Sequence, residues 1–162
     1  WRRLPARLRR EPGGRPYWPG GPAFSITHAA GYAACALAMP GLAIGVDLEP
    51  DGAAEPDQLR LLTTELERRA MRAGRVDAVR LWTSKEAVLK AAGADVTAAA
   101  QVEIDGEIGH HAGRRWYLQR LTPAPGLRLT LASALPLAAP QVSWPDPAAL
   151  FGDRDDRITG AS

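Results

Sequence analysis

The pattern of apolar and polar positions divides the chain into two kinds of segment. In the first third, short apolar runs alternate with turn-forming residues, a pattern that predicts strands. Phe24–Thr27 and Tyr32–Ala38 are two such runs, with the small residues 29–31 as the turn between them. Leu42–Leu48 follows a turn signal at Pro40-Gly41 and is mostly apolar, so we expect a buried strand. The three segments together predict a hairpin or a meander.

The middle of the chain changes to the period of a helix. A first helix is expected over Gln58–Ala73 and is closed by Gly74. A second helix is expected from Asp77, as its N-cap, to about Ala92, with Gly93 as its stop. The apolar positions that support the first helix share helical spacing: Leu59, Leu62, Leu66 and Ala70.

The last part of the chain returns to strands, which Gly and Pro residues separate: Gln101–Ile104, Arg115–Leu121 and Leu127–Ala134. Strands, then two helices, then strands is the order of an α+β domain. Three parts are therefore expected. Residues 1–23 form a lead-in rich in Arg, Pro and Gly, residues 24–135 form the folded core, and residues 136–162 form a Pro-rich and then acidic tail, poorly ordered past Phe151.

Composition narrows the class of protein. The single cysteine, Cys35, cannot form an internal disulfide, excludes a multi-cysteine zinc site and fits a reducing compartment such as the cytoplasm. No apolar run approaches ~18 residues, so no membrane-spanning helix is expected. The net charge is only +2, yet residues 1–15 hold six arginines and one acid. That cluster is either a solvated basic arm or a surface for phosphate groups, and nothing else in the chain indicates a nucleic-acid-binding module.

Two acids mark the end of the buried strand. Asp47 and Glu49 are spaced i and i+2, so their side chains point to the same face of a strand. Like charges this close repel unless a cation lies between them, and paired oxygen ligands are how proteins hold Mg²⁺. The alternative is two solvated acids at a strand end, and the pair by itself does not decide between the two interpretations.

A second candidate lies on the second helix, where Trp82, Glu86 and Lys90 form one stripe at i, i+4 and i+8. The chain has eighteen arginines and only two lysines, and both lysines, Lys85 and Lys90, belong to this helix. One interpretation is a carboxylate base beside a phosphate-binding ammonium with an aromatic wall. The other is a surface helix with a stabilising Glu–Lys pair. A third candidate is His28, which leaves its strand into a turn of small residues; a histidine satisfied in place is the alternative.

The three candidates occur in the order FSITHAAG, GVDLEP and LWTSKEAVLKAAG. This order resembles the signature of the 4′-phosphopantetheinyl transferases, and in particular of their Sfp-type branch. That branch modifies carrier proteins of nonribosomal peptide, polyketide and fatty acid synthesis. Gly14-Arg15-Pro16 resembles the Gly-Lys-Pro element of the family, and the resemblance covers roughly Arg10 to Ala134. It implies an antiparallel sheet packed on helices, mainly the second half of the usual two-half pseudodimer.

The resemblance also implies an activity: the Mg²⁺-dependent transfer of the 4′-phosphopantetheine arm from coenzyme A to a serine of an acyl or peptidyl carrier protein. Asp47 and Glu49 would hold Mg²⁺, and Glu65 resembles a third acid that some members add. Glu86 would act as general base, and Lys90 would bind the pyrophosphate of coenzyme A. The other residues that the resemblance places around coenzyme A are Trp82 and Lys85 beside Lys90, Thr27 and His28 at the 3′-phosphate, and Arg15 and Arg10 near the adenosine end.

Two departures from the family pattern bear on activity. The chain matches mainly one half of the usual two, which predicts a dimer or a first half that is missing here. The helix of Lys90 continues as Gly93-Ala94-Asp95, whereas family members usually have a Gly-Lys-Gly-like sequence there. The alternative function is therefore a truncated or inactive half that binds coenzyme A or a carrier protein without turnover. Neither alternative involves a nucleic acid or a membrane.

Overall fold

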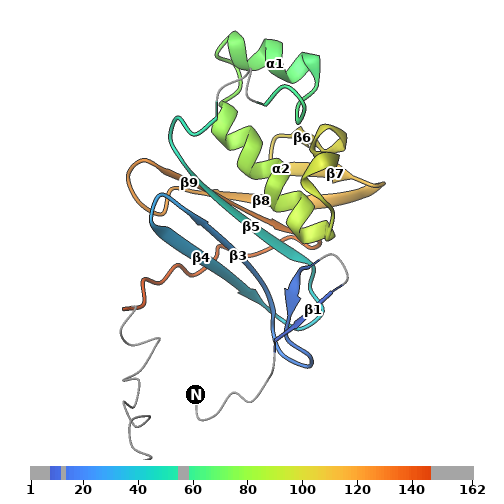
Figure 1. The fold of residues 1–162 in the computed structure, drawn as a ribbon, viewed down its shortest axis with the longest axis vertical. Coiled ribbons are helices and arrows are strands. Elements are labelled where there is room, and N and C mark those ends of the chain that lie inside the picture. The colour runs from blue at the N-terminus through green and yellow to red at the C-terminus, as the bar shows by residue number, and fades with distance from the viewer. Residues whose placement is uncertain (1–7, 12–13, 55–58, 147–162) are drawn as a thin grey trace, which may run out of the picture.

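The computed structural model describes residues 8–11, 14–54 and 59–146. Its main layer is a five-stranded antiparallel sheet in the order β5-β9-β8-β7-β6 (Figure 1). The strands are β5 (Ile44–Pro50), β6 (Glu103–Asp105), β7 (Ile108–His111), β8 (Arg114–Leu121) and β9 (Leu127–Ser133). Helix α2 (Ala78–Ala92) lies across one face of this sheet, and α1 (Glu65–Arg72) lies beyond the N-terminal end of α2. The α+β class expected from the sequence is confirmed.

A separate hairpin of β3 (Ala23–Ala29) and β4 (Tyr32–Ala38) lies beside β5 (Figure 1). The turn between its strands places Ala30 at φ 50° and Gly31 at φ 80°, as the small residues there predict. The inward side chains of the hairpin pack on the back of the large sheet, in a cluster of Ile44, Val46, Leu131 and the partly buried Ala23, Ala36 and Ala38. The hairpin thus covers the β5 edge of the sheet and the part of the back face next to that edge.

Helix α2 packs unusually close to β5, and Gly45 permits it. A Cβ at this position would lie 2.1 Å from the carbonyl oxygen of Ala87 and 2.5 Å from the backbone nitrogen of Ala91. Any side chain here would push the helix away from the strand. The interior between α2 and the sheet is apolar and includes Val88, Leu89, Val102, Trp116 and Leu118. Burial of this face fixes the rotation of α2 and with it the direction of every polar side chain on the helix.

The structure confirms the predicted ends of the second helix but not the predicted start of the first. The second helix is confirmed: Asp77 caps its start by accepting from the backbone N–H of Arg80, and Gly93 ends it in the left-handed region. The start of the first helix was predicted too early. Its N-cap is Thr64, which forms a capping box with Glu67, so the helix begins at Glu65. Gln58, the predicted start, lies outside the described residues.

The strand predictions also hold with shifts. The strands around Tyr32–Ala38, Arg115–Leu121 and Leu127–Ala134 are confirmed within about one residue, while the acid strand begins at Ile44, two residues late. Gln101 belongs to a 3-10 helix, η1 (Val96–Gln101), and only then does β6 begin. Three short strands were missed: β7, and the paired β1 (Arg9–Arg10) and β2 (Pro16–Tyr17) in the lead-in. The tail past Phe151 lies outside the described residues.

Candidate functional site

The acids of β5 face the polar stripe of α2. Asp47 lies directly opposite Thr130 of β9, and the hydroxyl of Thr130 is hydrogen-bonded to that of Thr83 on α2, 2.9 Å away, so this face of the sheet is the helix face. The ammonium of Lys90 lies 2.6 Å from Asp47 Oδ1 and 3.7 Å from Glu86 Oε2. Residues 43 positions apart in sequence therefore form one cluster of two acids and a lysine.

Strand β3 contacts the same aspartate. The hydroxyl of Thr27 donates to Asp47 Oδ1 at 3.2 Å, and the backbone N–H of Val46 donates to Ser25 Oγ at 3.1 Å. Thus Oδ1 accepts from both Thr27 and Lys90, while Asp47 Oδ2 is buried and has no hydrogen-bond partner among the described residues. A buried carboxylate oxygen without a partner is costly and suggests a group that the chain does not itself supply.

Glu49 completes the acidic side of the cluster. The Trp82 side chain lies close enough to Glu49 to oppose the rise in its pKa, so Trp82, the first residue of the helix stripe, also faces the acid strand. Glu86 is largely buried, with 19% of its side chain exposed, and Lys90 is exposed by 32%. Lys90 is thus the more exposed of the two, and a ligand can reach the cluster at its end of α2.

The three carboxyl groups disfavour each other's charge. Burial raises the pKa of Asp47, and Lys90 and Thr27 only partly oppose that shift. Burial and then the charge of Asp47 raise the pKa of Glu49. The same two causes, with a smaller contribution from Glu49, raise the pKa of Glu86. Lys90 is the cation that opposes all three shifts, so the cluster holds more negative charge than the lysine offsets.

The chemistry of this cluster fits a magnesium ion. Its donors are carboxylate oxygens, which Mg²⁺ prefers, and one of them, Asp47 Oδ2, is unused. The mutual repulsion of the three acids is what a divalent cation relieves. As the side chains stand, Lys90 occupies the position beside Asp47 Oδ1, and no three His, Cys, Asp or Glu side chains in the described part of the chain are grouped closely enough to hold a metal ion.

Two residues predicted for the site lie elsewhere. Lys85 is completely buried, and its amine donates to Glu67 Oε2 and to the carbonyl oxygen of Ala99, each at 2.9 Å. It points away from Lys90, because five helical positions turn the two side chains about 140° apart. Glu65 lies at the start of α1 and forms ion pairs with Arg68 and Arg69 on the surface, so it does not join Asp47 and Glu49.

The remaining predicted residues lie around the cluster at different depths. Thr27 is buried against Asp47, whereas His28, the next residue of β3, is exposed on the outer face of the hairpin. Arg15 reaches the start of β5 and the end of α2: its guanidinium donates to the carbonyl oxygen of Ile44 at 3.3 Å and lies near Gly93. Arg10 is exposed and donates to the carbonyl oxygen of Gly14. Arg15 thus borders the Lys90 end of the site, and Arg10 holds the backbone at Gly14, the residue before Arg15.

Sequence reasoning missed the supporting residues Ser25 and Gly45. Both precede a predicted site residue by two positions, Ser25 before Thr27 and Gly45 before Asp47. The alternation of small and polar residues in FSITH and GVD was the available signal, since residues i and i+2 of a strand share a face. The close approach that Gly45 permits depends on the position of α2, which no local pattern shows.

A comparison with models of known protein families assigns the chain to a superfamily. The family model of the 4′-phosphopantetheinyl transferase superfamily matches residues 43–139, which is more than half of the chain. The matched region contains β5, α2 and the strands that follow, and so includes Asp47, Glu49, Glu86 and Lys90. The chain belongs to the 4′-phosphopantetheinyl transferase superfamily. A search of curated proteins found no match.

The outer surface of the hairpin bears on the expectation of a dimer or a missing first half. The structure exposes apolar side chains there: Ile26 by 54%, Leu37 by 62% and Met39 by 69%. The strand of Asp47, by contrast, is almost wholly buried. Such a surface is required by either arrangement but does not distinguish between them. No helix of the described residues is both long and apolar enough to cross a bilayer.

Proposed function

We propose that this chain transfers the 4′-phosphopantetheine arm of coenzyme A to a serine of an acyl or peptidyl carrier protein, in the manner of the Sfp-type branch. The products are the holo-carrier protein and adenosine 3′,5′-bisphosphate. The observation that carries the proposal is the Lys90 ammonium 2.6 Å from Asp47 with Glu86 at its other side, in a chain of this superfamily. The single exposed Cys35 suits a reducing, cytoplasmic environment.

Glu86 is the proposed general base. Its side chain is mostly buried between Lys90 and the acids of β5, and its pKa is raised toward the working range of a base. The carboxylate accepts the proton of the carrier-protein serine as the serine oxygen attacks the phosphorus next to the pantetheine arm. That P–O bond forms as the bond to the adenosine 5′-phosphate oxygen breaks, and the bisphosphate leaves with the electron pair.

Lys90 is the proposed phosphate-binding residue. Its ammonium is partly exposed and exchanges its contact with Asp47 for the pyrophosphate when coenzyme A binds. Asp47 and Glu49, with Glu86 nearby, would hold Mg²⁺, which supplies charge neutralisation on the pyrophosphate oxygens when bound. Arg15 at the end of α2 extends positive charge toward the nucleotide. We leave Lys85 and Glu65 out of the site because of their contacts elsewhere.

The test is the mass of an apo acyl carrier protein after incubation with this chain, coenzyme A and Mg²⁺. A gain of one phosphopantetheine arm supports the proposal, and the same reaction with Glu86→Gln is the control for contaminating transferase. The alternative, a half that binds without turnover, gives saturable calorimetric binding of coenzyme A but no mass gain. No binding and no mass gain contradicts both. Sedimentation of the active sample then shows whether a second copy is required.

A further inference from the structure

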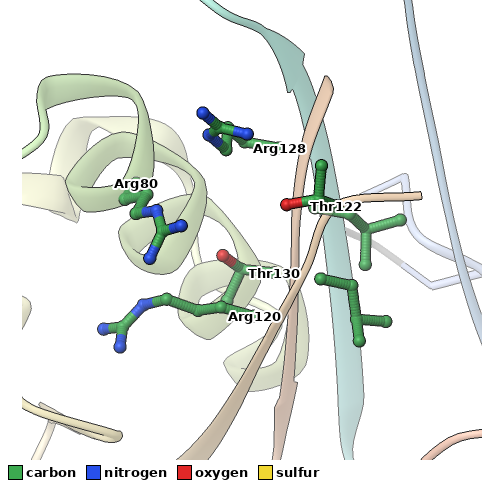
Figure 2. A pocket seen from close by; sticks show the side chains of 7 residues that line it. Arg80, Arg120, Thr122, Arg128 and Thr130 are labelled. Carbon is green, nitrogen blue, oxygen red and sulfur yellow. The ribbon is translucent and has the colours of Figure 1, made fainter. Parts of the chain in front are cut away.

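A small pocket lies between the first turn of α2 and the ends of β8 and β9, and three arginines reach it from three elements (Figure 2). Arg80 comes from α2, Arg120 from β8 and Arg128 from β9. The lining is completed by Leu121, Thr122, Leu129 and Thr130. None of these residues belongs to the carboxylate cluster.

The strand register explains why these side chains converge. Arg120 lies directly opposite Thr130 in the antiparallel pair, so both point to the helix face, and Arg128 points the same way because it precedes Thr130 by two residues. Two contacts then fix Arg120: its Nε donates to Ser84 Oγ at 3.3 Å and its Nη2 donates to the carbonyl oxygen of Gly106 at 2.6 Å. The fold thus orders part of the pocket before any ligand arrives.

Acids of neighbouring elements offset part of the charge of the three arginines, and Glu49 of β5 lies directly opposite Arg128. Arg128 forms an ion pair with Asp51, in which Arg128 Nε lies 3.0 Å from Asp51 Oδ1. That buried nitrogen nevertheless makes no aligned hydrogen bond with a described residue. Burial lowers the pKa of Arg120, Glu107 opposes the shift, and the charge of Arg80 adds to it. Arginines that repel one another around a concavity suit an anion as their common partner.

We propose that this pocket binds a phosphate-type oxyanion, either inorganic phosphate or the phosphomonoester group of a small molecule, at a site separate from the carboxylate cluster. Guanidinium groups form two parallel hydrogen bonds to such oxygens, and donors from three directions match a tetrahedral anion better than a planar carboxylate. The Thr122 hydroxyl adds a polar group to the same lining (Figure 2).

The pocket and the carboxylate cluster are neighbours on the sheet, since Arg128 and Thr130 lie directly opposite Glu49 and Asp47, but they face different sides of α2. Ser84, which holds Arg120, and Glu86 are two positions apart on the helix, so their side chains diverge by about 200°. An anion in the pocket would hold the first half of α2 to β8 and β9 without contacting Lys90. The inference therefore does not rest on the transferase proposal, and each can fail without the other.

The experiment is an amide-resolved NMR titration of the full chain with inorganic phosphate at constant ionic strength. A Lys90→Gln background removes the lysine that is proposed to bind phosphate in the carboxylate cluster. We expect saturable shifts at residues 80, 120 and 130. Arg80→Gln is the cleanest variant because its side chain is exposed and glutamine suits a helix. Loss of one charge-assisted contact should weaken binding about tenfold, and Arg128→Gln should do the same.

Arg115→Gln is the matched control. Arg115 is exposed like Arg80 and belongs to β8 like Arg120, but its side chain points to the opposite face of the sheet. It should leave the phosphate affinity unchanged. A second titration with adenosine 3′,5′-bisphosphate separates the two sources of the anion: tighter binding than phosphate at the same amides indicates an ester. Absence of saturable shifts at the pocket, or equal affinity in wild type, Arg80→Gln and Arg128→Gln, overturns the proposal.

Discussion

The two lysines of this chain lie on one helix yet have opposite surroundings. Lys85 is completely buried, with its amine held by Glu67 of α1 and by a backbone carbonyl oxygen. Lys90 is about one third exposed and lies against Asp47 and Glu86. Burial lowers the pKa of Lys85, and Glu67 opposes this shift. One lysine therefore joins two helices, whereas the other is available to a ligand.

Residue type and proximity in sequence therefore do not identify a phosphate-binding lysine. Both lysines occupy one motif, and the resemblance implied a ligand contact for each. The helix geometry turns them apart, and burial then decides which ammonium can exchange partners. A desolvated ammonium with a carboxylate and a carbonyl oxygen as partners is costly to disturb, whereas the partly exposed ammonium of Lys90 is not. Four predictions test this contrast.

The largest effect is expected on the Lys90 side. Glu86→Gln preserves shape and hydrogen bonding but removes the proton acceptor, so single-turnover transfer should slow by ~10²–10⁴. Coenzyme A binding, measured by calorimetry, should change little because the base acts on the incoming serine. The matched control is Glu67→Gln on the Lys85 side, which should keep the transfer rate per folded molecule. Equal loss of coenzyme A binding and rate in Glu86→Gln would make Glu86 only part of a binding surface.

The next effect is on stability. Lys85→Met leaves the Glu67 carboxylate and the Ala99 carbonyl oxygen without their partner, and breaking a buried pair in this way typically costs ~3–5 kcal/mol in the free energy of unfolding. The urea midpoint should fall while the coenzyme A affinity of the folded protein stays the same. Adding Glu67→Gln should recover part of the loss, since it removes the unpaired charge and retains an oxygen for the capping box. A coenzyme A affinity that falls with Lys85→Met would return Lys85 to the site.

A smaller effect is expected on ligand affinity. Lys90→Gln removes a charge-assisted contact to the pyrophosphate and should weaken coenzyme A binding about tenfold or more. Lys90→Arg should restore only part of it, because a planar fork does not replace a compact ammonium. Calorimetry of both variants measures this, beside Arg115→Gln as a surface control. Full rescue by arginine would remove the reason for a lysine in a chain that otherwise prefers arginine.

The smallest effect concerns pH and stability without metal. Burial raises the pKa of Asp47, so the folded chain binds its proton more tightly than the unfolded chain does. Ionised Asp47 then weakens the fold above its folded pKa, and this penalty vanishes below the unfolded pKa of ~3.9. Asp47→Asn should therefore raise the melting temperature at neutral pH, with the gain shrinking as the pH falls toward that value. Asp105→Asn on exposed β6 is the control. A lower melting temperature at neutral pH would mean that the Lys90 ion pair outweighs burial.

The sequence predicted elements well where local signals agree. Asp77 and Gly93 bound α2 as expected because a cap residue and a left-handed glycine act within one turn of the chain. The first helix was placed too far upstream because its leucine period continues through residues 59–62, whereas the Thr64–Glu67 capping box starts the helix later. Strand β7 was missed because four residues containing Gly109 and two histidines carry no clear alternation, and only pairing with β6 and β8 makes them a strand.

For the candidate site, the periods of a strand and a helix are enough to predict that Asp47 and Glu49 share a face and that Trp82, Glu86 and Lys90 form a stripe. Tertiary packing makes the two sets face each other, through the close approach of α2 to Gly45. It also separated Lys85 and Glu65 from the site, and it brought Arg80, Arg120 and Arg128 together from distant elements. Local periods fix directions along one element, but only packing fixes which elements share a space.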